Sequence, residues 1–81
     1  MTFVYIGNLT SRVEGLGTFG PFGHTFDMGE GQALDLIARQ GGLPAIPQEV
    51  FATLGNISPA VALQEMRERV ANGGPLIEGG E

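Results

Sequence analysis

A six-residue segment near the N-terminus matches a motif that binds nucleotide phosphates. Residues 15–20 read GLGTFG, a literal G-x-G-x-x-G, whose glycines let a backbone approach a pyrophosphate. In a dinucleotide-binding fold the motif follows a strand and opens a helix, whose N-terminal N–H groups hold the phosphates. Here Pro21-Phe22-Gly23 comes next, and no helical pattern begins before residue 28. The glycine loop of kinases also needs a lysine, which the chain lacks. We interpret the motif as turns and expect no cofactor.

The remaining residues that could do chemistry lack the partners that the chemistry needs. His24 is the only imidazole, and the sequence supplies neither an orienting group nor a nucleophile for a general base. One histidine and no cysteine fall short of the three or four ligands of a zinc site and exclude disulfides. Glu65 and Arg69, four residues apart, form an ordinary surface pair on a helix. We expect no catalytic residue, no metal site and no enzymatic activity.

Composition narrows the classes of partner. The chain has 81 residues, nine acids and four bases, all of them arginine, and a net charge of −5. It lacks the basic stripe that nucleic-acid binding requires. No apolar run approaches the roughly 18 residues that span a bilayer, and the N-terminus lacks the basic start of a signal peptide. We expect synthesis in the cytoplasm and no contact with nucleic acid or membrane.

Three short strands are predicted in the first third of the chain. β-Branched and aromatic residues indicate a strand over residues 2–6, covered on both faces. Residues 11–14 are expected to pair back on it. Residues 24–28 form a third strand that leads to Asp27, which we expect to cap a helix with Glu30 three residues later.

Three helices are predicted in the remainder. The first ends at Gly41-Gly42, and residues 41–47 form a connector that two prolines stiffen. Pro47 suits the first turn of a second helix over residues 48–54. Ser58-Pro59 starts a third, which runs to about residue 72 with Arg67 on its polar face. Its apolar stripe is Ala62, Leu63, Met66 and Val70.

These elements define an α+β fold, in which a small antiparallel sheet of three or four short strands is followed by two or three α-helices. Residues 1–73 form one domain, and residues 74–81 form a flexible C-terminal arm. So short a chain buries a limited interior, and its 14 glycines raise the entropy lost on folding. Both facts favour assembly with other subunits.

Large apolar residues on irregular backbone are the predicted partner contacts. The glycine-rich loop over residues 15–23 either folds back on the sheet or projects into a neighbouring molecule, and a domain this small offers few places to bury such groups. The predicted partner-binding residues, from this loop and from the arm, are Leu16, Phe19, Phe22, Leu76 and Ile77.

The first 42 residues resemble small uncharacterised proteins encoded among the head genes of tailed bacteriophages. The resemblance lies in Val4-Tyr5-Ile6-Gly7, the short polar strand, the GLGTF run, the strand to Asp27 and the helix closed by Gly-Gly. The chain departs from the pattern by inserting residues 20–23 and adding two helices and a tail. The resemblance implies a structural role in the virion, as a capsid decoration (cement) or head–tail joining protein, and it implies no catalytic residues.

Two functions remain open. The first is a non-enzymatic subunit that binds a protein lattice or other virion subunits as a homo- or hetero-oligomer, made in the bacterial host cytoplasm and carried in the virion. The second is a small acidic inhibitor or regulatory adaptor that occupies a basic site on a host enzyme. An inhibitor that mimics nucleic acid would gather its acids on one face, whereas these are spread from Glu14 to Glu81.

The glycine motif is expected not to bind dinucleotides. Titration of the protein with NAD, FAD and ATP should show no saturable binding, because turns present no helix N-terminus to a phosphate. Saturable micromolar binding that is lost in Gly17→Val would overturn the interpretation of the motif as turns.

Overall fold

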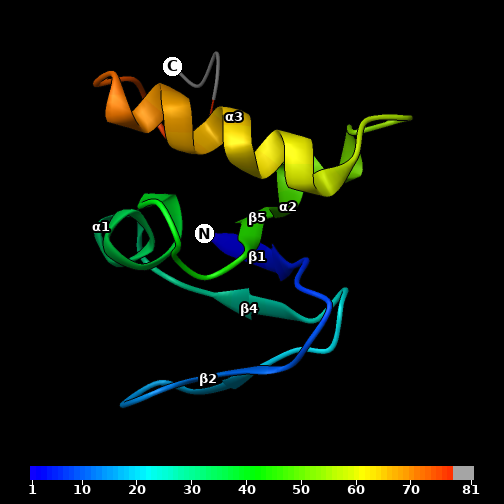
Figure 1. Cartoon of the computed structure of the whole chain (residues 1–81), viewed down its shortest axis with the longest axis vertical. Helices are drawn as coiled ribbons and strands as arrows, with labels where there is room; N and C mark the ends of the chain where they lie inside the picture. Colours follow the sequence, from blue (N-terminus) through cyan, green and yellow to red (C-terminus); the bar gives the residue numbers. More distant parts are fainter. Residues whose placement is uncertain (78–81) are drawn as a thin grey trace.

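A computed structural model describes residues 1–77 and shows an α+β fold, which confirms the predicted fold class. The main sheet has three antiparallel strands in the order β4–β1–β5: β4 (Thr25–Asp27), β1 (Thr2–Tyr5) and β5 (Ala45–Pro47). Along the long axis of the molecule, α3 lies at one end, followed by this sheet and then by a separate hairpin that contains β2 (Figure 1).

The central strand β1 joins the two halves of the sheet and is buried on both faces, as its apolar run predicts. Phe3 lies opposite Phe26 of β4 and opposite Pro47 of β5. Phe3, Val4 and Tyr5 are all buried. A strand with neighbours on both sides and no solvated face is the element around which the core forms.

The second strand does not pair with the first, which corrects the sequence prediction. β2 (Ser11–Val13) pairs instead with β3 (Gly17–Phe19), a strand inside the segment predicted to be turns only. Gly15 and Gly17 have φ values of 85° and 104°, a region that suits glycine and that allows the reversal between the two strands. The glycines therefore make a hairpin rather than an irregular loop.

The first helix begins later than predicted and is irregular. Asp27 ends β4 and accepts a hydrogen bond from the Thr2 hydroxyl at 2.6 Å, so it does not cap the helix. Gly29 is the N-cap and provides no side-chain cap. One turn of α-helix, α1 (Glu30–Ala33), continues as a π-helix, η1 (Leu34–Ala38).

The end of η1 is held by α3 (Pro59–Ala71) through one side chain. The Arg67 guanidinium donates hydrogen bonds to the carbonyl oxygens of Ile37 (3.1 Å), Gly42 (2.9 Å) and Leu43 (3.4 Å). Burial of this group lowers the pKa of Arg67. The prediction that Arg67 lies on a solvated face is wrong, because its guanidinium binds these three carbonyl groups.

The predicted proline connector is a strand. β5 occupies residues 45–47 at the edge of the sheet, where a proline without an N–H group is tolerated. Pro47 is the N-cap residue of α2 (Gln48–Ala52) and precedes the first helical position where it was expected. The third helix is confirmed: the Ser58 hydroxyl accepts from the Ala60 N–H at 3.2 Å, and Ala62, Leu63 and Met66 are buried.

The chain turns back on α3 directly after the helix ends. The Gly74 N–H donates to the Arg69 carbonyl at 2.8 Å, and a Cβ at Gly74 would lie 2.7 Å from Arg69 Cγ. Leu76 is only 2% exposed, and its carbonyl accepts from Arg69 at 3.0 Å. Leu76, in the segment predicted to be a flexible arm, therefore packs against the fold, and residues 78–81 of that segment lie outside the described residues.

Replacing Arg67 by Met should lower the free energy of unfolding by about 2–4 kcal/mol, because partly buried carbonyl groups lose a charged donor while the aliphatic volume stays. The matched control is Arg39→Met at an exposed position, expected to change stability by less than about 0.5 kcal/mol. Urea denaturation measures both. Equal stability of the two variants would show that the Arg67 contacts contribute nothing net.

Candidate partner-binding surface

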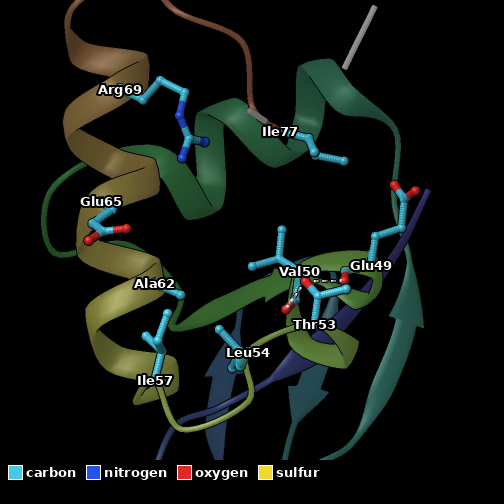
Figure 2. Close-up of a pocket in the computed structure, with 9 residues that line it drawn as sticks. All are labelled: Glu49, Val50, Thr53, Leu54, Ile57, Ala62, Glu65, Arg69 and Ile77. Atoms are coloured by element: carbon cyan, nitrogen blue, oxygen red, sulfur yellow. Dashed lines mark hydrogen bonds between the residues drawn. The ribbon is translucent and has the colours of Figure 1, made fainter. Parts of the chain in front are cut away.

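A groove of about 360 Å³ lies between α2 and α3, and Ile77 also lines it (Figure 2). Its lining combines apolar side chains with three charged groups and one hydroxyl. The lining residues are Glu49, Val50, Thr53, Leu54, Ile57, Ala62, Glu65, Arg69 and Ile77.

One wall is α2 and the loop that follows it. Val50 lies in α2 and Leu54 lies in the loop after it, and both side chains line the groove. The Thr53 hydroxyl donates to the carbonyls of Glu49 and Val50, both at 3.2 Å, which closes the helix end. The Ile57 N–H then donates to the Leu54 carbonyl at 3.0 Å. This short loop therefore holds Ile57 at the groove.

The opposite wall is one face of α3. Ala62, Glu65 and Arg69 are spaced by three and four residues, which places them in a row along a helix. Ile57 comes directly before the capping Ser58 and Ala62 is the fourth helical residue, the two positions of a hydrophobic staple. Ile57 nevertheless remains 54% exposed, so its side chain is available to a partner.

The groove offers apolar contact beside carboxylate acceptors. Glu49 and Glu65 are exposed, while Arg69 donates to the Leu76 carbonyl. In Figure 2, Glu65 and Arg69 lie along α3, and Glu49 and Val50 lie across from it on α2. Within residues 1–77, no group of three histidine, cysteine, aspartate or glutamate side chains is placed to hold a metal ion. The lining therefore suits an aliphatic group beside polar groups that can meet two carboxylates and one guanidinium.

Two predicted partner residues belong to the core. Phe19 is 7% exposed, and its ring packs edge-on against Phe26 with centroids 4.8 Å apart. Leu76 is buried under the turn after α3. The expectation that these two side chains are exposed is wrong. For Phe19 the physical reason is that β3 folds back toward the sheet, one of the two outcomes considered for this loop.

The other three predicted partner residues reach the surface at different places. Phe22 is 52% exposed and lies against Phe51 of α2, with ring centroids 6.1 Å apart. Ile77 is half-buried in the groove. Leu16 is exposed in the turn between β2 and β3 and does not line the groove. Thus α2 contacts Phe22 through Phe51 and contributes a wall of the groove that Ile77 lines.

Sequence analysis missed Ile57 and Val61, which are both about half-exposed. Ile57 carried a usable signal, since an apolar residue before a capping serine indicates a staple at the surface. Val61 lies one helical turn before Glu65 and outside the apolar stripe, which also indicates exposure. Both signals are local, and neither reveals that α2 lies across the groove from α3.

The glycine motif and His24 lie outside this surface. Residues 15–20 cover the hairpin turn and β3, and the next element is strand β4, so the helix that a pyrophosphate would need does not follow. The His24 ring stacks near Phe26 with centroids 6.4 Å apart and is exposed.

Comparison of the chain with protein-family models, curated proteins and solved structures gave no match. Within residues 1–77, no helix combines the length and the hydropathy needed to cross a membrane. The role of this surface must therefore be inferred from its own chemistry.

Phe19 and Phe22, three residues apart, should respond differently to alanine. Phe19→Ala should lower the free energy of unfolding by about 3 kcal/mol, because it empties a core position. Phe22→Ala should lower it by about 1 kcal/mol or less, because half of the ring is already in solvent. Thermal or urea denaturation of both variants gives the comparison, and an equal loss would show that Phe22 is also a core residue.

Proposed function

We propose that the chain is a non-enzymatic structural subunit of a virion that binds a protein lattice, as a capsid decoration (cement) or head–tail joining protein. The observation that carries the proposal is the set of exposed apolar side chains on and around α2 and the start of α3. Phe22, Ile57 and Val61 come from different segments and are each about half-exposed. Phe22 contacts Phe51 of α2, and Ile57 lines the groove beside that helix. Single exposed apolar residues are common, whereas exposed apolar residues that come together from different segments are typical of a contact surface.

The physical properties of this surface support protein contact. Burying one such large side chain fully is worth about 1.5–3 kcal/mol, so several of them can anchor a small subunit. Phe22 is an aromatic group on a loop between two strands, and aromatic anchors are enriched at the centres of interfaces. The carboxylates of Glu49 and Glu65 beside the groove favour a partner with basic groups.

The virion assignment has separate support. The first 42 residues resemble head-region proteins of tailed bacteriophages, and small size with a limited core suits a subunit that a larger assembly covers. In this proposal the chain is made in the host cytoplasm and joins the particle during head assembly.

Mass spectrometry of density-purified particles from the culture that produces the chain tests the assignment. The chain should be present, and Phe22→Ala should weaken its attachment by about 1–3 kcal/mol while the free protein stays folded. Phe22→Tyr keeps the ring and serves as the matched control, with attachment near that of the wild type.

Two results would contradict the proposal. One is the absence of the chain from purified particles, especially if it is recovered in a soluble complex with a host enzyme, as the inhibitor hypothesis requires. The other is equal attachment of the Phe22→Ala variant and the wild type, which would show that this surface does not contact the particle.

A further inference from the structure

Leu9 is the most exposed large apolar side chain within residues 1–77, at 81%. It lies in the loop between β1 and β2, far along the sequence from the groove. Its backbone is held in place, because its carbonyl accepts a hydrogen bond from the buried Tyr5 hydroxyl, which also bonds to Ser11 Oγ at 2.7 Å. The loop therefore presents an apolar side chain to solvent on a fixed support.

Close packing under this loop adds to its rigidity. A Cβ at Gly7 would lie 2.7 Å from Tyr5 Cζ and 2.9 Å from Pro44 Cγ, so the loop follows the tyrosine ring without a gap. A side chain displayed on ordered backbone loses less conformational entropy on binding than one on a mobile segment. This loop is therefore preorganised for an intermolecular contact through Leu9.

A cation accompanies the exposed leucine. Arg12 lies three residues further on, in β2, and is exposed. Three residues of extended chain span about 10 Å, so this segment offers an aliphatic group and a guanidinium at two separate points. The groove presents apolar Val50, Leu54 and Ala62. Its charged groups are two carboxylates, Glu49 and Glu65, and one guanidinium, Arg69, so the lining carries a net negative charge.

The dimensions also match. A volume of about 360 Å³ is near the small end of ligand sites, which span about 300–1,000 Å³. It can take one or two side chains of a short segment rather than a helix or a folded surface. The described part of the chain thus displays both an apolar–cationic projection and an apolar–acidic groove of suitable size.

We propose that the α2–α3 groove binds the loop of residues 8–12 from a second copy of this chain. Leu9 enters the apolar part of the groove, and the Arg12 guanidinium meets the Glu65 carboxylate. The inference rests on the proposed function, for which it names a partner. The two surfaces differ, so the contact is head-to-tail and generates a ring or an open row of subunits rather than a two-fold dimer.

A contact of this size is weak for two free molecules and becomes effective on a particle. Small interfaces of this kind belong to the transient class. Copies already attached to one lattice face each other at a high effective concentration, which converts weak contacts into stable rows. Self-association in solution should therefore depend steeply on protein concentration.

Sedimentation velocity over about a hundredfold range of concentration tests the contact, and the sedimentation coefficient of the wild type should rise with concentration. Leu9→Ala and Glu65→Arg should each weaken association by about tenfold or more. Leu16→Ala and Glu68→Arg remove another exposed leucine and reverse another charge on α3, and both should associate like the wild type. Circular dichroism melting verifies that each variant is folded.

A charge exchange gives the sharpest test. Arg12→Glu alone and Glu65→Arg alone should each associate weakly, because like charges then meet at the groove. An equimolar mixture of the two variants should recover association, since every groove then finds a loop of opposite charge. Recovery in the mixture would not follow from a loss of folding in either variant.

A wild type that stays monomeric over the whole range, or a mixture that fails to recover, would overturn the inference. Neither result bears on the attachment of the chain to particles, which the Phe22 variants measure separately. Conversely, self-association without attachment to particles would support the head-to-tail contact and contradict the proposed function.

Discussion

The arrangement of the helices depends on the carbonyl groups at the end of η1, which need hydrogen-bond donors from elsewhere in the chain. The last carbonyls of a helix have no partner within it and carry partial negative charge. Arg67 reaches them from α3 and also binds the following carbonyls of Gly42 and Leu43, so one side chain links α3 to the π-helix and to the approach to β5. Although burial lowers the pKa of Arg67, a guanidinium stays protonated, so the contact persists at ordinary pH. Because α3 is also a wall of the groove, this buried contact fixes where Glu65 and Ala62 lie.

Tyr5 holds the loop between β1 and β2 in place, just as Arg67 holds the end of η1. Its ring is buried with the central strand, and its hydroxyl bonds to both sides of the loop that leads to the hairpin. Two long side chains that are apolar along most of their length and polar at the tip therefore connect the core to surface features. The two surfaces of the proposed head-to-tail contact are supported separately, so a change in one need not disturb the other.

Local signals predicted much of the fold, and nonlocal contacts account for the errors. Ser58-Pro59 specifies the start of α3 by itself, and the apolar run of β1 specifies a buried strand. The π-helix could not be predicted, because its end is stabilised by Arg67, 30 residues away. β5 was missed because prolines argue against a strand, and only the sheet order shows that it is an edge.

Phe19 and Phe22 look alike in sequence, and their different burial follows from β3 pairing with β2. The groove joins segments whose proximity no local pattern encodes, although the position of Ile77 as a large apolar residue on irregular backbone predicts a partner contact.

The central position of β1 has a consequence for biosynthesis. This strand leaves the ribosome before its two neighbours, residues 25–27 and 45–47, and the Arg67 contact comes later still. Phe3, Val4 and Tyr5 therefore stay an incompletely paired apolar segment until residues 45–47 have been made. Sheet formation through such distant pairings is slow compared with local folding and leaves the nascent chain open to aggregation. Translation speed and chaperone access are thus expected to govern the yield of folded protein.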